Sequence, residues 1–195
     1  MNKTGILILA AGSSSRMGQP KQLLSYQHKT LLANTIESAK SAADGIVLVI
    51  LGGNHMLVAE QLTADDILYN EGWEEGISSS IRIGLAEMIK RYPALDQVIL
   101  SVCDQPFITE KIFKSLIKEA EIPGKSIVAS SYLGTIGTPV LFDKKHFGDL
   151  AVLKGKEGAK IILNKFKEQV ASVPFEKGEI DIDTPDDYNR LINSQ

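Results

Sequence analysis

Short runs of uninterrupted apolar residues recur along this chain and limit the folds that are open to it. They cover residues 5–11 and 46–51, and a mostly apolar run follows at 97–102; segments with helical spacing of apolar residues separate them. An apolar run without polar alternation is typical of a strand that is covered on both faces. Strands that alternate with helices predict a mostly parallel central sheet with helices on both faces. We therefore predict one α/β domain over residues 1–195, of Rossmann-like architecture.

The remaining elements follow from periodicity, helix caps and turn residues. Thr109, with Glu110 in the first turn, and Thr184, ahead of Pro185, are favourable helix starts. The sequence contains no repeat, low-complexity segment or linker that would divide this pattern. Helices are predicted over 31–43, 56–62, 77–91, from 109, near 158–166 and after 184–185, and further strands over 67–69, 126–131, 138–142 and 170–174.

Charge and cysteine content narrow the classes of partner. The net charge is −3, and Cys103 is the one cysteine among 195 residues. A mildly acidic chain lacks the basic surface that a nucleic-acid backbone requires, so we expect no nucleic-acid partner. A lone cysteine excludes an internal disulfide and a cysteine-based zinc site, and it fits a reducing compartment. The run 5–11 is too short for a signal peptide or a membrane span, so we expect a cytoplasmic protein with no membrane partner.

The first motif is the string LAAGSSSRMGQPK, from Leu9 to Lys21, at the end of the first predicted strand. Two glycines let backbone N–H groups approach phosphates closely, and the cations Arg16 and Lys21 would offset the phosphate charge. The string fits neither the P-loop pattern nor the Rossmann dinucleotide fingerprint. Its composition alone is equally compatible with a solvated strand-to-helix connection.

The second motif is the string VCDQP, from Val102 to Pro106, at the carboxyl end of a central strand, where ligands collect in open α/β sheets. Mg²⁺ needs only one or two protein carboxylates beside phosphate oxygens and water, so Asp104 is a candidate metal ligand. The alternative is an aspartate that caps the following turn. Cys103 could in principle be a nucleophile, but a cysteine borne on a strand is usually buried and inert.

The third motif is the acidic string EIDIDTPDD, from Glu179 to Asp187. Asp181 and Asp183 alternate along a strand-like stretch, and we expect one of them to face the site. The alternative is that the acidic residues solubilise the start of a helix and favour its dipole, which we prefer for Asp186 and Asp187.

Two further features are less specific. The loop 70–80 opens a helix, so its serines and amides could meet an anion or a base. His28, His55 and His146 lack any metal-binding spacing, and we expect them to be structural or solvated.

Taken together, the three strings closely resemble the motifs of the molybdopterin nucleotidyltransferase (MobA/MocA-like) family. The first matches its signature LxxGxSxRMGxxK, CDQP matches its CDxP segment, and DIDTP matches its terminal acidic segment. The resemblance runs from Leu9 to Asp183 with the motifs in the family's order. It implies that the predicted α/β domain has a nucleotidyltransferase fold.

The resemblance also implies roles for individual residues. In the family the first loop wraps the triphosphate, so Arg16 would meet the phosphate tail and Lys21 the α-phosphate region. Arg16, Lys21 and Asp104 become the candidate catalytic residues, and Asp104 with Asp183 the candidate ligands of Mg²⁺, or of Mn²⁺ in its place. Contacts to the nucleotide are implied for Ala10, Ala11, Gly12, Ser13, Arg16, Lys21, Gly76, Ser78 and Ser79.

For the substrates, Ala10-Ala11-Gly12 is similar to the cytidylyl-transferring branch, where the guanylyl-transferring branch has Leu-Ala-Gly-Gly. The resemblance thus implies transfer of CMP from CTP to molybdenum cofactor, for a molybdenum hydroxylase client such as a xanthine dehydrogenase. Segments 137–139 and 155–159 resemble those that face the acceptor, with Lys156-Glu157 in place of the usual Gly-Asp. GTP as donor, a sugar or polyol phosphate as acceptor, and a non-catalytic role in cofactor delivery stay open as alternatives.

Overall fold

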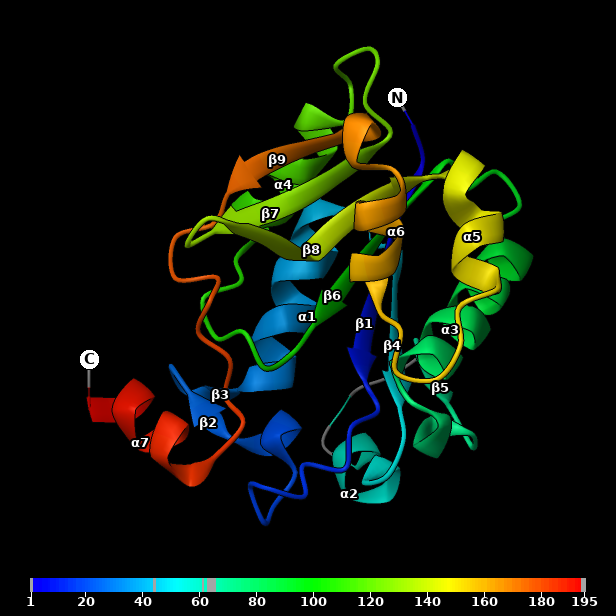
Figure 1. The fold of residues 1–195 in the computed structure, drawn as a ribbon. Coiled ribbons are helices and arrows are strands. Elements are labelled where there is room, and N and C mark those ends of the chain that lie inside the picture. The colour runs from blue at the N-terminus through cyan, green and yellow to red at the C-terminus, as the bar shows by residue number, and fades with distance from the viewer. Residues whose placement is uncertain (1, 44, 61, 63–65, 194–195) are drawn as a thin grey trace.

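A seven-stranded sheet lies at the centre of the computed structural model, which describes residues 2–43, 45–60, 62 and 66–193 (Figure 1). The strand order is β5-β4-β1-β6-β8-β7-β9. All neighbouring pairs are parallel except those of β8, which runs antiparallel to both β6 and β7. The strands are β1 (Thr4–Ala10), β4 (Val47–Leu51), β5 (Ile67–Tyr69), β6 (Gln97–Val102), β7 (Ile127–Tyr132), β8 (Thr135–Asp143) and β9 (Val170–Pro174).

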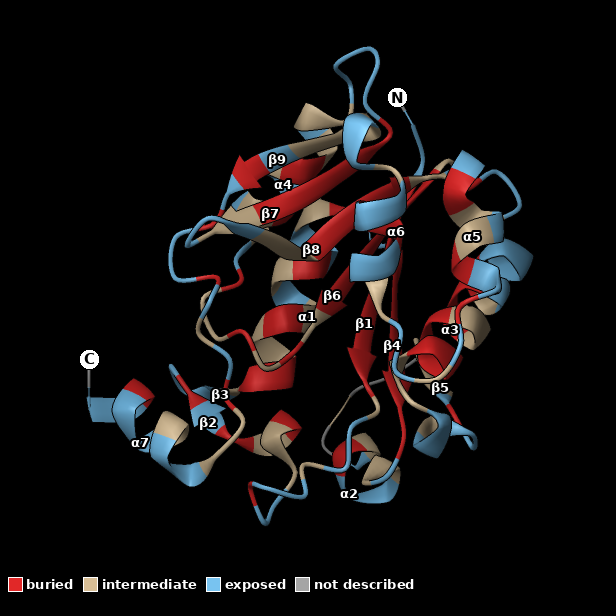
Figure 2. Ribbon diagram, in the orientation of Figure 1, coloured by how far each residue is buried: buried red, intermediate tan, exposed pale blue. Residues whose placement is uncertain are grey.

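Helices cover both faces of this sheet and divide the core into two clusters of buried side chains (Figure 2). One face is covered by α1 (Leu31–Ala42), α2 (His55–Ala59) and α4 (Glu110–Glu119). The other is covered by α3 (Ile77–Arg91), α5 (Phe147–Ala151) and α6 (Ala159–Lys165). The chain also forms the 3₁₀ turns η1 (Lys21–Leu23), η2 (Trp73–Glu75), η3 (Lys144–His146) and η4 (Lys167–Gln169).

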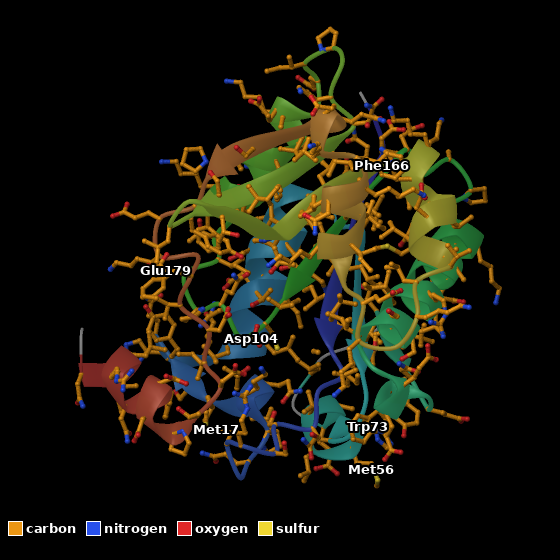
Figure 3. The ribbon with its side chains drawn as sticks, in the orientation of Figure 1. Met17, Met56, Trp73, Asp104, Phe166 and Glu179 are labelled. Atoms are coloured by element: carbon orange, nitrogen blue, oxygen red, sulfur yellow. The ribbon has the colours of Figure 1, made fainter. Side chains whose placement is uncertain are left out.

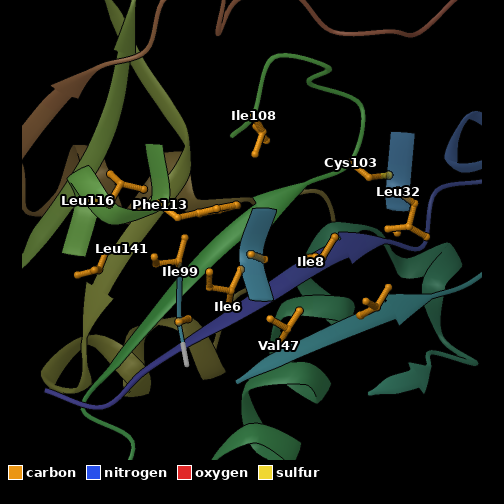
Figure 4. Close-up of a cluster of buried hydrophobic side chains, with 14 of the residues drawn as sticks. Ile6, Ile8, Leu32, Val47, Ile99, Cys103, Ile108, Phe113, Leu116 and Leu141 are labelled. Carbon is orange, nitrogen blue, oxygen red and sulfur yellow. The ribbon is translucent and has the colours of Figure 1, made fainter. Parts of the chain in front are cut away.

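The surroundings of strand β1 explain why its residues 5–10 are apolar without interruption. Successive side chains of a strand point to opposite faces, so a strand between two helical layers must be apolar at every position. Ile6 and Ile8 pack into the first cluster, and Leu7 and Leu9 into the second. Figure 4 shows Ile6 and Ile8 beside Phe113 of α4 and Leu32 of α1.

A third, smaller cluster lies away from the sheet and joins the two ends of the chain. It contains Met17, Leu24, Tyr26, Leu31, Ile182 and Leu191. Here the short hairpin β2 (Ser25–Tyr26) and β3 (Lys29–Thr30) lies near α7 (Pro185–Asn193), as Figure 1 shows.

The predicted α/β fold with a mostly parallel sheet is confirmed, and the element bounds agree within a few residues. The predicted strand 138–142 is longer, because β8 begins at Thr135 and continues the turn after β7. Thr109 occupies the N-cap of α4 but its side chain makes no capping hydrogen bond, whereas Thr184 Oγ1 accepts one from Asp187 N at 3.3 Å. The predicted helix 56–62 is α2, which ends at Ala59; residue 61 lies outside the described residues.

The elements absent from the prediction are short. The β2–β3 hairpin has two residues per strand, and α5 has five residues, so neither leaves a measurable periodicity. None of the helices within the described ranges combines the length and apolarity that crossing a bilayer requires.

Candidate active site

A cleft of about 320 Å³ opens at the carboxyl ends of β1 and β6, which are neighbouring parallel strands. Leu9 and Val102 are register partners, so the segments that follow the two strands emerge side by side. This is the edge of an open α/β sheet where ligands bind. Of the residues predicted from sequence, Ala10, Ala11, Gly12, Ser13, Lys21, Gly76 and Asp104 line the cleft. Figure 3 shows Asp104 near the middle of the molecule, at the end of β6.

The charged centre of the site is one ammonium group between two carboxylates. Nζ of Lys21 contacts Oδ2 of Asp104 and lies 3.2 Å from Oδ1 of Asp183. The other oxygen of Asp183 is 2.9 Å from the Arg16 guanidinium. The four charged residues from three separate motifs therefore form one connected ion-pair network.

Burial differs across this network. The side chains of Lys21 and Asp104 are 16% and 19% exposed, and that of Arg16 is 68% exposed. Burial would lower the pKa of Lys21, but the attraction of Asp104 and then Asp183 outweighs it and raises the pKa to about 12. Lys21 is therefore cationic at neutral pH and can balance phosphate charge.

Two neighbours of the network have raised pKa values. Burial, together with the charges of Asp104 and Asp183, raises the pKa of Asp181 to about 6. Burial and the charge of Asp104 raise the pKa of Cys103 to about 12. The thiol is therefore protonated at neutral pH, and this agrees with the prediction that Cys103 is not a nucleophile.

Two buried apolar residues bring Arg16 and Asp183 together. Met17 and Ile182 are 5% and 0% exposed and pack in the same cluster. Ile182 also donates its backbone N–H to the carbonyl of Asp104 at 2.9 Å. Because Arg16 precedes Met17 and Asp183 follows Ile182, burial of both apolar residues in this cluster keeps the charged pair in the same region.

The loop between β1 and η1 is fixed by the buried amide of Gln22. Its Nε2 donates to the carbonyl oxygens of Ala10 at 2.8 Å and Gly12 at 3.1 Å. The Ser14 hydroxyl donates to Gln22 Oε1 at 3.3 Å and accepts from the backbone N–H of Lys21 at 3.0 Å. These hydrogen bonds join the beginning of the loop to its end. They restrain Ala11 and Gly12 so that both residues continue in the direction of β1.

We expect Gln22→Ala to lower the free energy of unfolding by about 1–3 kcal/mol, because it leaves buried carbonyl oxygens without their donor. The nucleotide affinity should fall as well, since the loop loses its internal restraint. Urea unfolding and calorimetric titration with nucleotide measure the two effects.

The control is Gln169→Ala, which removes an acceptor of the Ser126 hydroxyl (3.0 Å) at the opposite edge of the sheet. It should affect stability alone. Equal nucleotide binding by Gln22→Ala and the wild type would show that this amide does not shape the site.

The end of the cleft away from the charges is formed by uncharged side chains. Trp73, Gly76, Ile77 and Ser80 line it. Trp73 packs on the backbone after β4, because a Cβ added to Gly53 would lie 3.0 Å from its ring. An uncharged wall next to a charged centre is suited to a nucleoside whose phosphates point to the cations.

Two predicted residues make structural contacts instead of lining this wall. The Ser78 hydroxyl donates to the carbonyl of Glu157 at 2.5 Å. The Ser79 hydroxyl donates to the carbonyl of Gly76 at 2.8 Å and accepts from Asn70 at 2.8 Å. Both side chains are almost fully buried.

The segments predicted to face an acceptor occupy different positions. Gly155 lies against Gly76, with its carbonyl accepting from the backbone N–H of Ser78 at 3.2 Å. Gly137 packs beneath Tyr132, and Thr138 donates to Gln105 at 3.3 Å. The first segment therefore packs against Gly76 without lining the cleft itself, whereas the second lies on β8.

The three histidines lie outside the charged network. His55 stacks on Tyr69 with ring centroids 3.8 Å apart. His146 is buried, with Nε2 at 2.9 Å from the Ser126 hydroxyl, and burial lowers its pKa. His28 is exposed in the β2–β3 turn.

The donor set suits a hard divalent cation that shares its ligands with phosphate. Within the described residues, no group of three or more His, Cys, Asp or Glu side chains could hold a metal by itself. Asp104 and Asp183 nevertheless converge on one atom, and two carboxylates are sufficient protein ligation for Mg²⁺ when phosphate oxygens complete the shell.

An open α/β sheet with a closed glycine- and serine-rich loop, a lysine and two carboxylates at its carboxyl edge can accommodate a nucleotide whose phosphates meet the charged centre. The sequence matches the family described as MobA-like NTP transferase domain over residues 6–171. The chain belongs to this family.

Individual relatives support the same assignment at moderate identity. The purine catabolism protein PucB of Bacillus subtilis is 28% identical, with 95% of this chain and 94% of that protein covered. The molybdenum cofactor cytidylyltransferase of Escherichia coli is also 28% identical, with 96% and 95% covered.

Solved structures share the fold. The Rv0371c protein of Mycobacterium tuberculosis superimposes with a TM-score of 0.82 at 29% identity over 98% of both chains. Its complex with manganese gives a TM-score of 0.79 at 28% identity over 100% of both chains. A relative of this protein therefore binds a divalent metal.

Some residues of the site were not singled out from the sequence. Gln22, Met17 and Ile182 act through contacts, and no pattern in the chain marks which buried side chain supports a loop. Trp73 and Ser80 lie in the predicted loop 70–80, but only the cleft shows that they line it.

Proposed function

We propose that this protein transfers CMP from CTP to the terminal phosphate of molybdenum cofactor and releases pyrophosphate, with Mg²⁺, or Mn²⁺ in its place, as the metal. The observation that carries the proposal is the contact of Lys21 with Asp104 and Asp183 at the rim of an otherwise uncharged cleft. We further propose that it acts in the cytoplasm, as one catalytic domain, and supplies a molybdenum hydroxylase.

In the proposed reaction a phosphate oxygen of the acceptor forms a bond to the α-phosphorus of the nucleotide. The bond from that phosphorus to the bridging oxygen breaks, and pyrophosphate leaves with the electron pair. Lys21 and Arg16 would offset the negative charge that develops, and no protein nucleophile is needed because positioning and electrostatics are sufficient. Asp104 and Asp183 would hold the cation, which supplies further charge stabilisation when bound.

The choice of CTP rests on Ala10-Ala11-Gly12 and on the similarity to a cytidylyltransferase. GTP with the same acceptor and CTP with a sugar or polyol phosphate would use the same charged centre. A cofactor-delivery protein without catalysis would not require two carboxylates converging on a lysine.

The test is thermal unfolding with CTP, GTP, ATP and UTP, with and without Mg²⁺, followed by a pyrophosphate-release assay with molybdenum cofactor. A ligand at about 100 times its dissociation constant adds about 2.7 kcal/mol of stability. For a chain of this size each kcal/mol raises the melting temperature by roughly 2–4 °C. We expect a Mg²⁺-dependent shift with CTP and pyrophosphate release only when the cofactor is present.

Each alternative predicts a different pattern. A shift with GTP alone identifies the guanylyl donor, and release with a sugar or polyol phosphate but not with the cofactor identifies another acceptor. Cofactor binding with no pyrophosphate release under any condition contradicts catalysis and favours the delivery role.

A further inference from the structure

A loop from Leu153 to Gly158 is held against the start of α3 by hydrogen bonds in which Arg82 takes a central part. Arg82 donates to both carboxylate oxygens of Glu75, at 2.8 and 2.7 Å, and to the carbonyl of Leu153 at 2.7 Å. Glu75 in turn accepts the backbone N–H of Gly155 at 3.3 Å. The arginine and the glutamate thus bind both the beginning and the middle of loop 153–158.

The contact between this loop and α3 is close as well as hydrogen-bonded. Gly76 has a φ of +120°, and a Cβ at this position would lie 2.4 Å from the carbonyl oxygen of Gly155. Ser78 contributes two more bonds, from its N–H to Gly155 and from its hydroxyl to Glu157. No side chain larger than hydrogen fits at Gly76 while the loop is docked.

The docked loop stands directly behind the uncharged end of the cleft. Gly76 and Ile77 line that end, and Gly155 supports Gly76 from the other side. Among the described residues, the charged network of Lys21, Asp104 and Asp183 lies on different segments and forms no ion pair with Arg82 or Glu75. A change in the docking of the loop should therefore move the wall and leave the charged centre in place.

We propose that Arg82 and Glu75 are positioning residues for the nucleoside end of the donor, because they fix loop 153–158 behind the wall that the base and ribose contact. This inference rests on the proposed function, since it assumes that a nucleotide occupies the cleft. It predicts that the pair controls nucleotide affinity and discrimination between bases, whereas Lys21 and Asp104 control the chemical step.

The test compares Arg82→Met with the wild type. The methionine keeps much of the side-chain length and removes all three hydrogen bonds. We expect faster hydrogen exchange at the amides of loop 153–158, a KM for CTP that is roughly tenfold higher, and a kcat that changes less than about twofold, which is the signature of lost uniform binding. Discrimination between CTP and GTP should weaken.

Conservative variants separate positioning from folding. Arg82→Lys can make one ion pair but not the bidentate contact, so it should restore part of the affinity. Glu75→Gln should raise KM in the same direction and serves as the second variant if Arg82→Met does not fold. The matched control is Arg91→Met, since Arg91 is also an arginine of α3 that pairs with a glutamate (Glu87, at 2.7 Å), and its side chain is 32% exposed against 29% for Arg82. It should leave KM unchanged.

Nucleotide dissociation constants from calorimetry distinguish the two proposals. If the wild type binds CTP and Arg82→Met binds it equally well, the positioning role is overturned, whether or not transfer is detected. A fall in kcat with unchanged KM also overturns it. A wild type that binds CTP without pyrophosphate release contradicts the proposed function alone, and one that binds no nucleotide contradicts both.

Discussion

Asp104→Asn should lower the rate of nucleotide transfer by about 100-fold or more, while the fold is retained. A metal ion contributes several kcal/mol of charge stabilisation in the transition state, and each 1.4 kcal/mol corresponds to about tenfold in rate. The amide keeps the size of the carboxylate but loses the charge that a divalent cation and Lys21 require. Pyrophosphate release at saturating nucleotide and acceptor measures the effect.

The same strand offers a matched control for this substitution. Asp96 immediately precedes β6, as Asp104 follows it after one residue, and it pairs with Lys144 at 2.7 Å on the opposite edge of the sheet. Asp96→Asn should leave transfer unchanged. Full transfer activity in Asp104→Asn would overturn its assignment as a metal ligand.

Lys21→Met should reduce transfer by about 100- to 1,000-fold, the range seen when one preorganised group that stabilises transition-state charge is removed. The methionine preserves the apolar stem but removes the ammonium that contacts both Asp104 and Asp183. The effect should appear in kcat, because the charge that Lys21 offsets develops during bond formation. Single-turnover kinetics with saturating CTP measure it directly.

An exposed lysine that follows η1 along the chain provides the comparison. Lys29 pairs with Glu37 at 2.5 Å, and its side chain is 48% exposed, so Lys29→Met should be close to neutral. Thermal unfolding checks that both variants remain folded. If the two lysine variants have the same kcat, Lys21 does not act on the reacting phosphates.

The sequence predicted those elements whose residue pattern depends on their own burial and not on particular partners elsewhere in the chain. Burial on both faces made residues 5–10 of β1 and all of β4 continuously apolar and β6 mostly so, and each strand was therefore visible without knowledge of its neighbours. Parallel neighbours with their carboxyl ends together then explain why the loop 9–21 and Asp104, distant in sequence, share one cleft. The roles assigned to these residues remain predictions.

Contacts between distant segments were not predictable in the same way. The choice of Asp183 came from a family resemblance, and its place beside Lys21 depends on Met17 and Ile182 meeting in one cluster. The docking of loop 153–158 involves a hydrogen bond from Arg82, which from sequence is simply a charged residue of a helix. The contacts of such side chains cannot be predicted from their residue type, because they depend on how the elements that they join are arranged in space.

The ion-pair network also has a consequence for the protein as it is being synthesised. Lys21 and Asp104 are 83 residues apart, but Lys21 and Asp183 are 162 residues apart, and β9 ends the sheet at Pro174. At roughly 5–20 residues per second, about 10 to 30 seconds separate the synthesis of Lys21 from that of Asp183. A chain synthesised as far as Pro174 thus contains the residues of every strand of its sheet and still lacks the second carboxylate. The nascent protein acquires its complete charged centre only after the scaffold around it.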